Sequence, residues 1–413
     1  MTDHAIRATC GIAGGGPAGM MLGFLLARAG VDVVVLEKHA DFFRDFRGDT
    51  IHPSTLELVH ELSLLDEFLA LPHQEVRVLN ARVGDTELTV ADFSRVPTRC
   101  PFIAMMPQWD FLNFLARHAA RYPAFRLCMQ AEVTGLIEEG GRVIGLLART
   151  ADGPLEVRAD LVIGADGRGS VVREKAGLRV TELGAPIDVL WFRLSRHPSD
   201  PRETIGRFDR GRIVVMINRE EYWQCGFVVR KGSIDEIHRC GLPAFRAEIA
   251  RIAPFLADRL GELADWDAVK LLTVRVDRLP TWYRPGLLCI GDAAHAMSPV
   301  GGVGINLAIQ DAVATANLLA APLRAGGVTV DHLRRVQRRR ELPTRVTQRL
   351  QVIVQDRIIS RVLDHAGPLR PSLALRILSR VPALRRLPAR VVGLGIRPEH
   401  IHTPVAARDG GVA

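Results

Sequence analysis

Three glycines near the N-terminus have the spacing that places a phosphate against the start of a helix. Gly14, Gly16 and Gly19 follow the apolar run 8–13 and open a helical segment, 17–29. The first glycine permits a tight turn, the second lets the backbone approach a pyrophosphate, and the third lets the helix pack closely on the strand. The free N–H groups of the first helical turn favour an anion at this position.

A carboxylate stands where the next strand should end. Glu37 follows the apolar run 31–36, after a break at Gly30. A carboxylate in this place accepts hydrogen bonds from both ribose hydroxyls and repels a 2′-phosphate. The pattern therefore predicts that the ligand of this loop is FAD or NAD rather than NADP.

Two further apolar runs also end in a carboxylate and glycine. The run 161–164 leads to Asp166 and Gly167, and the run 287–290 leads to Gly291 and Asp292. The second of these continues into a glycine-rich stretch, 299–306, and a second helix start, whose free amides suit an electron-rich ring edge. Two such sites far apart in the chain predict one long ligand held at both ends.

The elements that position these loops follow from periodicity. Strand, glycine turn, helix and strand over residues 8–36 open a doubly wound α/β sheet. Helical spacing of apolar residues predicts helices over 53–71, 107–121 and 303–325. The alternation over 187–230 predicts an inserted antiparallel sheet. The residues after 326 are helical and interrupted by prolines.

Composition narrows the class of protein. The 413 residues carry a net charge of +8 and 47% hydrophobic residues, as in an ordinary globular chain. The six cysteines lie far apart, which argues against a disulfide framework and a zinc site, so we predict no metal. The N-terminus has no apolar leader core, and no long uncharged apolar run occurs, so we expect a cytoplasmic protein.

Basic charge is concentrated in residues 331–390, which hold fifteen arginines and four acidic residues. The segment has no aromatic residues and no nucleic-acid-binding motif, so we expect a solvated helix face and no nucleic acid as partner. The Arg- and Leu-rich stretch 369–396 leaves a membrane-surface role open, although its prolines favour a packed C-terminal cap.

In this order, the motifs make the chain resemble the class A flavoprotein monooxygenases, the para-hydroxybenzoate hydroxylase family. The resemblance covers most of the chain. It rests on the fingerprint 14–19, on Arg47 within RGDTIHPST, and on the Asp-Gly and Gly-Asp motifs at 166–167 and 291–292. Gly48 departs mildly from the alanine that usually follows this arginine.

The resemblance implies an α/β fold: a Rossmann-like FAD-binding domain with an inserted mixed or antiparallel β-sheet substrate domain and C-terminal helices. It implies FAD-binding parts at 1–180 and 281–325, a substrate domain at 181–280 and a helical region at 326–413. The family's cofactor-binding positions fall here on the following residues: Gly14, Gly16, Gly19, Glu37, Lys38, Arg47, Gln108, Val133, Asp166, Asp292, Gly304, Ile305 and Asn306.

The resemblance also implies the activity. NADH or NADPH would dock transiently and reduce FAD. The reduced flavin would form a C4a-hydroperoxide with O₂ and hydroxylate an aromatic or polyketide-like small molecule. No catalytic side chain is assigned. Pro299, Gly301 and Gly302 would lie beside the flavin ring. The inserted sheet offers these candidates for lining the substrate cavity: Trp191, Arg193, Met216, Gln224 and Phe227.

Other interpretations of the same chain differ in chemistry. A flavin-dependent reductase of an isoprenoid or other apolar substrate would share the fold without using oxygen, and a membrane-surface protein would not be catalytic. A flavin halogenase is disfavoured because no W-x-W segment occurs. We expect His295 to be a packed residue rather than a base, and His52 to lie at a helix start.

Overall fold

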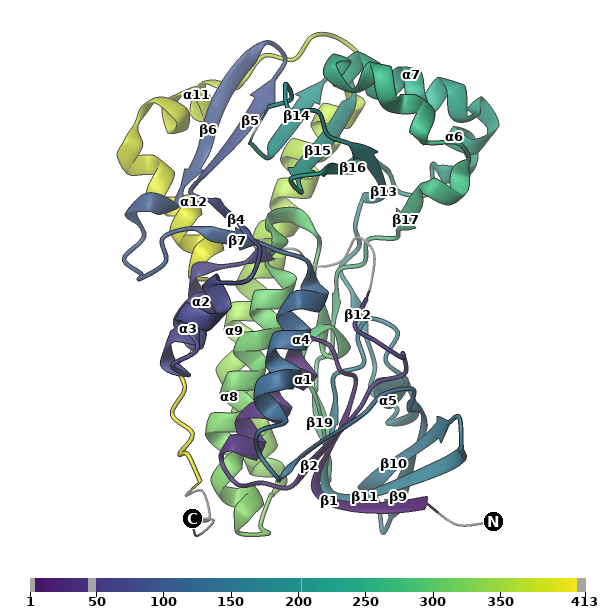
Figure 1. The fold of residues 1–413 in the computed structure, drawn as a ribbon, viewed down its shortest axis with the longest axis vertical. Coiled ribbons are helices and arrows are strands. Elements are labelled where there is room, and N and C mark those ends of the chain that lie inside the picture. Colours follow the sequence, from purple (N-terminus) through teal and green to yellow (C-terminus); the bar gives the residue numbers. More distant parts are fainter. Residues whose placement is uncertain (1–3, 44–49, 202, 407–413) are drawn as a thin grey trace.

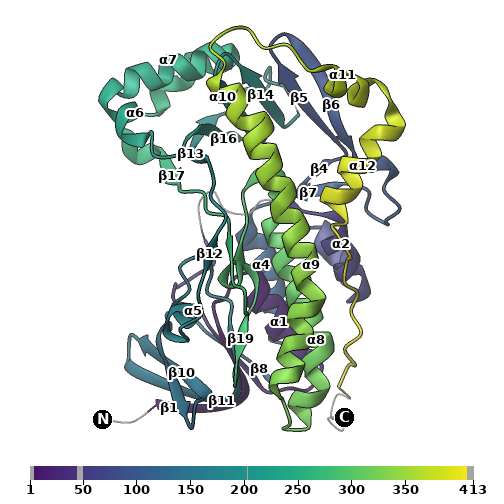
Figure 2. The same ribbon diagram turned by 180° about the vertical axis from the view of Figure 1, so that it is seen from behind.

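The computed structural model describes residues 4–43, 50–201 and 203–406. Figure 1 shows a lower body built on one sheet and an upper body built on another. The long helix α9 (Val330–Val354) runs beside both, as the reverse view in Figure 2 shows.

The lower sheet contains the strands that the apolar runs predicted. Five parallel strands lie in the order β20-β11-β1-β2-β8. β2 and β20 are buried along their whole length, as are residues 10–13 of β1 and 161–164 of β11, which suits continuous apolar runs. The parallel strands are β1 (His4–Ala13), β2 (Val33–Leu36), β8 (Phe125–Cys128), β11 (Gly153–Gly164) and β20 (Leu287–Cys289). Antiparallel partners are β9 (Glu132–Glu139), β10 (Arg142–Thr150) and β19 (Tyr283–Arg284).

Three helices pack together on one side of this sheet: α1 (Pro17–Arg28), α4 (Gln108–Ala119) and α8 (Gly304–Arg324). The short α5 (Val171–Lys175) lies beside β9 instead (Figure 1). The segment 300–324 is long and apolar enough to cross a membrane, but 72% of its most apolar window is buried inside the protein. It therefore forms part of the hydrophobic core.

The upper sheet has the order β17-β13-β16-β15-β14-β5-β6. The predicted alternation over 187–230 supplies β13 (Ile187–Ser195), β14 (Ile205–Asp209), β15 (Arg212–Asn218) and β16 (Tyr222–Arg230). The remaining strands are β5 (Val78–Val83), β6 (Thr86–Asp92) and β17 (Lys270–Leu272). The division of the chain at residue 180 therefore does not match the sheets, because β5 pairs in parallel with β14.

Two further helices and two small sheets complete the fold. α6 (Ile234–Cys240) and α7 (Leu242–Ile252) cover one face of the upper sheet. One small sheet is β3 (Thr50–Ile51), β7 (Ile103–Met105) and β4 (Gln74–Val76). The other is β12 (Thr181–Glu182), β18 (Asp277–Arg278) and β21 (His295–Ala296).

One helical prediction needs correction. The segment 53–71 is not one helix but two, α2 (Pro53–Glu61) and α3 (Leu65–Leu69). Ser63 between them has a φ of 59°, in the left-handed region that breaks a helix. The C-terminal segment forms α10 (Ser360–Asp364), α11 (Leu373–Arg380) and α12 (Pro382–Gly393), and the last two contact β6.

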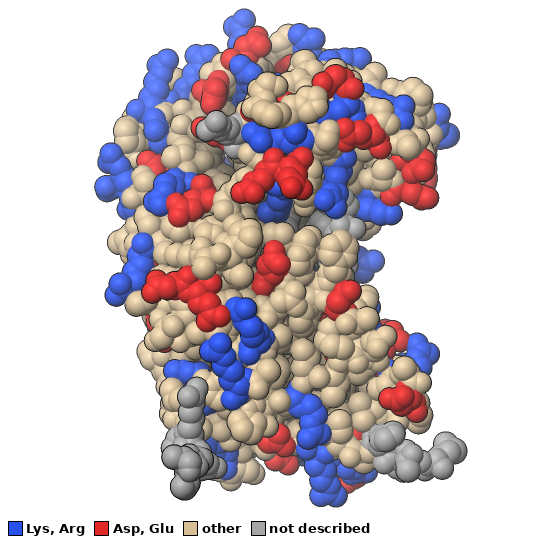
Figure 3. All heavy atoms as spheres, viewed as in Figure 1, with Lys and Arg blue, Asp and Glu red and all other residues tan. Residues whose placement is uncertain are grey.

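Part of the arginine excess is used inside the protein. Arg339 and Arg340 both contact the carboxylate of Glu399, at 2.7 and 3.2 Å. On the face drawn in Figure 3, basic and acidic side chains are interspersed over most of the surface. The arginine-rich segment is thus partly structural.

The buried face of α9 is polar. Gln348 and Gln351 lie almost fully buried, whereas Leu342, Leu350 and Ile353 on the same helix are exposed. The amide of Gln348 donates to the carbonyl oxygens of Asp277 and Ala296 at 2.7 and 3.0 Å. These bonds attach α9 to the backbone of β18 and β21, which offsets the cost of burying the polar side chain.

Replacing Gln348 with leucine should remove the side-chain donor from two buried carbonyl oxygens. We expect Q348L to lower the free energy of unfolding by about 2–3 kcal/mol, measured by urea denaturation. The exposed neighbour R349L serves as the control. Equal stability of the two variants would show that these bonds do not hold α9 in place.

Candidate active site

Three loops meet at the carboxyl edge of the lower sheet. The amide of Gly14 donates to Leu36 O at 2.8 Å, that of Ala165 to Ala13 O at 2.8 Å, and that of Ile290 to Gly164 O at 2.9 Å. Parallel neighbouring strands end on the same side, so the motifs after β1, β11 and β20 form one continuous edge. This is where open α/β sheets bind ligands.

Of the three motif glycines in this loop, only Gly16 has open space where a side chain would be. A Cβ on Gly14 would lie 2.4 Å from Ala165 O, and its φ of +101° also disfavours other residues. A Cβ on Gly19 would lie 2.0 Å from Gly14 O. A Cβ on Gly16 would meet nothing within 4 Å, so the backbone there faces open space. In the described residues α1 has no side-chain cap, which leaves its first amides available to an anion.

Glu37 closes one end of this edge. Its Oε2 accepts from the Gly15 amide at 2.9 Å and its Oε1 from the His39 amide at 3.1 Å. The Ala131 amide donates to the Glu37 carbonyl, and this brings Val133 on β9 toward the same end. Lys38 is exposed beside it.

Asp292 closes the other end, together with an arginine that the motif analysis did not single out. Arg168 Nε lies 3.0 Å from Asp292 Oδ2, and both side chains are about one-third exposed. Arg168 follows the Asp-Gly motif, so the second and third motifs are joined by an ion pair. The sequence offered no signal for this pairing beyond the strand-end position of both residues.

A buried carboxylate holds the loop that carries Asp292. Asp311 on α8 is fully buried and accepts from Gly291 N at 3.1 Å, His295 Nε2 at 2.6 Å and Arg340 Nε at 2.9 Å. Burial by itself raises the pKa of Asp311. His295 and Arg340 each oppose this through their charge and their hydrogen bond, and the net effect is a lowered pKa. Asp311 therefore stays ionised and ties the loop to α8 and α9.

The carboxylate of Asp166 makes its hydrogen bonds within its own loop. Its carboxylate accepts from Ser170 Oγ at 2.5 Å and from the Val172 amide at 3.1 Å, which shapes the start of α5. Burial raises its pKa, although these hydrogen bonds oppose that shift. These bonds hold the loop after β11 to the start of α5.

The glycine-rich stretch before α8 is held from the side by β3. Thr50 Oγ1 donates to Gly302 O at 2.8 Å, and Gly302 has a positive φ, as does Gly301. The side chain of Asn306 accepts from the His52 amide at 2.9 Å and from Thr55 Oγ1 at 2.7 Å. Asn306 thus anchors the start of α2, while α8 has no side-chain cap in the described residues.

Other predicted positions differ in how far the structure describes them. Arg47 lies outside the described residues. Gln108 is the first residue of α4, after β7, which pairs with β3. Gly304 and Ile305 begin α8, directly after Pro299 and the two positive-φ glycines. Gln108 and the start of α8 are therefore brought to the same region through the small sheet of β3 and β7.

The five substrate-cavity candidates divide between the two faces of the upper sheet. The prediction that Met216 and Phe227 line the cavity needs correction. Both pack in the core under α7, where the Phe227 ring lies 5.3 Å from that of Phe245. Trp191 projects from the opposite face and covers Gly226. Strand alternation places Arg193 and Gln224 on this face too.

The match to known proteins is decisive at the level of family. Residues 7–350 match the family model described as FAD binding domain. This chain belongs to that FAD-binding family. A curated relative, 6-methylpretetramide 4-monooxygenase of Streptomyces rimosus, is 32% identical over 391 residues, covering 94% of this chain and 93% of the relative.

Further comparisons agree. Rifampicin monooxygenase of Streptomyces venezuelae is 29% identical, and the alignment covers 73% of this chain and 61% of that protein. The structure of OxyS anhydrotetracycline hydroxylase from Streptomyces rimosus aligns with a TM-score of 0.74 at 23% identity, over 94% of this chain and 76% of that one, which shows the shared fold. The predicted family, fold class and FAD cofactor are confirmed, and the chain is an FAD-dependent oxidoreductase of the monooxygenase type that uses NAD(P)H.

The two glycines allow FAD binding to be separated from folding. G14A should destabilise the protein and weaken FAD binding, because its methyl group collides with Ala165 O. G16A should leave the melting temperature of the apoprotein unchanged but weaken FAD binding about tenfold or more, because its methyl group occupies space left for phosphate. Flavin titration and thermal unfolding of both variants check this. Unchanged FAD affinity in G16A would contradict it.

His52 makes the stability depend on pH. Burial lowers its pKa from 6.5 to about 4, although its hydrogen bond to Val392 O opposes the shift. The unfolded state binds the extra proton below pH 6.5, so stability should fall by about 3 kcal/mol as pH drops from 6.5 to 4. H52Q should lose less stability over that range, measured by urea denaturation at several pH values. Parallel pH profiles for both proteins would contradict this assignment.

Proposed function

We propose that this enzyme hydroxylates an aromatic or polyketide-like small molecule, using O₂ and either NADH or NADPH as transient reductant. The observation that carries the proposal is the continuous edge from Gly16 to Asp292. It leads to the glycine stretch 299–302, where Val300 lies in one cluster with Trp191 of the upper sheet. The relatives named 6-methylpretetramide 4-monooxygenase and rifampicin monooxygenase support it.

In this proposal the chain's residues divide the cofactor between them. Gly14, Gly16 and Gly19 with the start of α1 hold the pyrophosphate, and Glu37, with Lys38 and Val133 beside it, holds the adenosine end. Arg47, Gln108, Asp166 and Asp292 serve the ribityl side, as the family resemblance implies. Bound FAD supplies the redox chemistry, since it can take a hydride from a nicotinamide and react with O₂.

The start of α8 would face the electron-rich edge of the ring. The amides of Gly304, Ile305 and Asn306 carry the positive end of the helix dipole, and no side chain in the described part of the chain caps them. Thr50 and Asn306 fix this turn through Gly302 O and the start of α2. The turn is thus held in place before a ligand arrives, which favours electrostatic stabilisation of developing negative charge.

Apolar side chains would enclose the substrate. Trp191, Val215 and Ile217 of the upper sheet share one cluster with Met105 and with Val392 of α12. This composition suits a largely apolar ring and excludes water from the reacting centre. Pro299, Gly301 and Gly302 would form the floor beside the flavin, and Arg193 and Gln224 the rim.

We also propose a cytoplasmic location. All six cysteines lie in the described residues and none is paired in a disulfide. Unpaired thiols are the usual state of proteins in a reducing compartment.

Isotope labelling tests the reaction. With NADH or NADPH, ¹⁸O₂ and a panel of aromatic polyketides, the product should carry one ¹⁸O atom. A reduced substrate formed without O₂ uptake would support the alternative of a flavin-dependent reductase. Purified protein that binds no flavin would contradict both.

The two faces of the upper sheet provide a matched pair of variants. W191A should raise the KM for the aromatic substrate several-fold, because a large apolar side chain of the proposed substrate cavity is lost. M216A lies on the opposite face and should lower stability by about 2–5 kcal/mol with little change in KM. Steady-state kinetics and urea denaturation of both variants check this, and an equal rise in KM would place the substrate elsewhere.

A further inference from the structure

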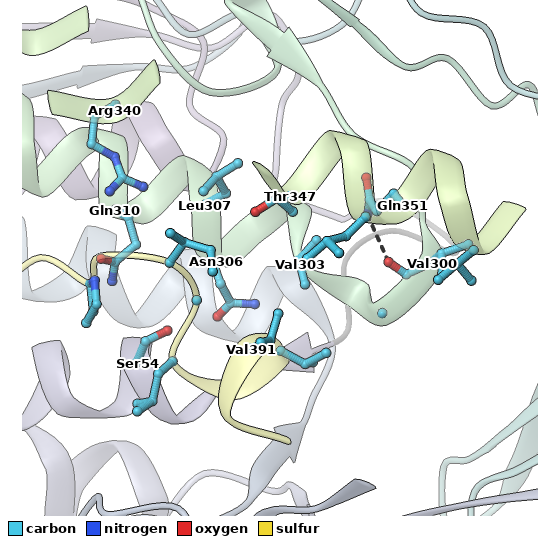
Figure 4. Close-up of a pocket in the computed structure, with 18 residues that line it drawn as sticks. Ser54, Val300, Val303, Asn306, Leu307, Gln310, Arg340, Thr347, Gln351 and Val391 are labelled. Atoms are coloured by element: carbon cyan, nitrogen blue, oxygen red, sulfur yellow. Dashed lines mark hydrogen bonds between the residues drawn. The ribbon is translucent and has the colours of Figure 1, made fainter. Parts of the chain in front are cut away.

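A cavity of about 140 Å³ lies between α8, α9 and the C-terminal residues after α12 (Figure 4). It borders the glycine stretch at Val300 and Gly301 and extends along α8 toward Gln310 and Arg340. Most of its wall is apolar, contributed by Val303, Leu307, Leu350, Val354, Val391 and Ile396. Leu350 and Val391 are partly exposed and mark its opening to the surface.

Two buried donors form the polar end of this cavity. Gln310 is 4% exposed and Arg340 is 1% exposed, and both line the cavity. Among the described residues, Gln310 Nε2 and Arg340 Nη2 have no hydrogen-bond partner. Their other polar atoms are occupied: Gln310 Oε1 accepts from the Glu399 amide, and Arg340 Nε and Nη1 donate to Asp311 and Glu399. Buried donors without acceptors are rare, so this pair indicates a missing acceptor.

The guanidinium groups that border these donors are already matched by carboxylates. Arg339 and Arg340 face Asp311 and Glu399, and His295 bonds to Asp311 and does not line the cavity. An additional anion would leave an uncompensated buried charge, which is costly. The acceptor that suits this end is therefore uncharged.

We propose that this cavity binds a small uncharged compound with an apolar body and one carbonyl oxygen, which accepts from Gln310 Nε2 and Arg340 Nη2. A closed apolar cavity of similar size binds benzene, so a single substituted ring fits the volume. Water alone is a poor occupant, because the long apolar wall cannot give each molecule its two to four hydrogen bonds. The inference rests on the cavity and does not depend on the proposed reaction.

Acetophenone is the probe, with ethylbenzene as the analogue that lacks the oxygen and benzoate as the charged analogue. Calorimetric titration of the holoenzyme should show acetophenone binding about tenfold more tightly than ethylbenzene, and no binding of benzoate. Q310L removes one of the two donors and should reduce the preference for acetophenone over ethylbenzene, whose own affinity should stay unchanged. The unchanged ethylbenzene affinity shows that the cavity remains folded.

Two variants that fill the cavity identify the site. L307W on α8 and V354F on α9 should each abolish acetophenone binding, whereas the control L373W on exposed α11 should bind normally. Three outcomes would overturn the proposal: equal affinity for acetophenone and ethylbenzene, binding that persists in the filled variants, or no binding at all. The last outcome would mean that the cavity holds water only. W191A should bind acetophenone normally, so failure here is distinguishable from failure of the proposed reaction.

Discussion

The contact between Gly14 and Ala165 is the constraint on which the rest of this site depends. Strands β1 and β11 run side by side and end together, so closely that no Cβ fits at Gly14. This closeness brings the first and second loops into one surface, and β20 on the other side of β11 adds the third. A ligand that extends from Glu37 to Asp292 needs all three loops in this order.

The flavin end of the edge depends on buried charge rather than on strand geometry alone. Asp311 connects the loop after β20 to α8 and α9, and Arg340 connects Asp311 to Glu399 near the C-terminus. Segments far apart in sequence are thereby fixed relative to the same loop. Such a network is expensive to break, because removal of one partner leaves an uncompensated charge inside the protein. The cavity proposed as a ligand site lies at the other end of this network, next to Arg340.

Strand-end motifs could be predicted because the information is local. Gly14, Glu37 and Asp292 each follow an apolar run that is long enough to be recognised, and the parallel order of the sheet then brings them together. Pairings between distant segments were not visible in the sequence: β5 with β14, or Arg168 with Asp292. Asp311 carried a signal that could have been used, since a single carboxylate within the apolar helix predicted at 303–325 needs a buried cation.

Alternation by itself could not decide which face of a strand borders the site. Both faces of β13, β15 and β16 are largely apolar, one under α7 and one toward α12. Met216 and Trp191 are therefore equally plausible from the sequence alone, and only the position of α6 and α7 over one face of the sheet separates them (Figure 1). The polar inner face of α9 is unpredictable for a related reason, because its glutamines are matched to backbone groups of β18 and β21 that come from other parts of the chain.

Binding of half-ligands tests most directly whether one FAD molecule spans this edge. The apoprotein should bind ADP and FMN weakly and FAD far more tightly than either. G16A should weaken FAD and ADP but not FMN, and D292A should weaken FAD and FMN but not ADP, each by about tenfold or more. If D292A left both FAD and FMN binding unchanged, or weakened ADP binding equally, the two loops would not hold opposite ends of one cofactor.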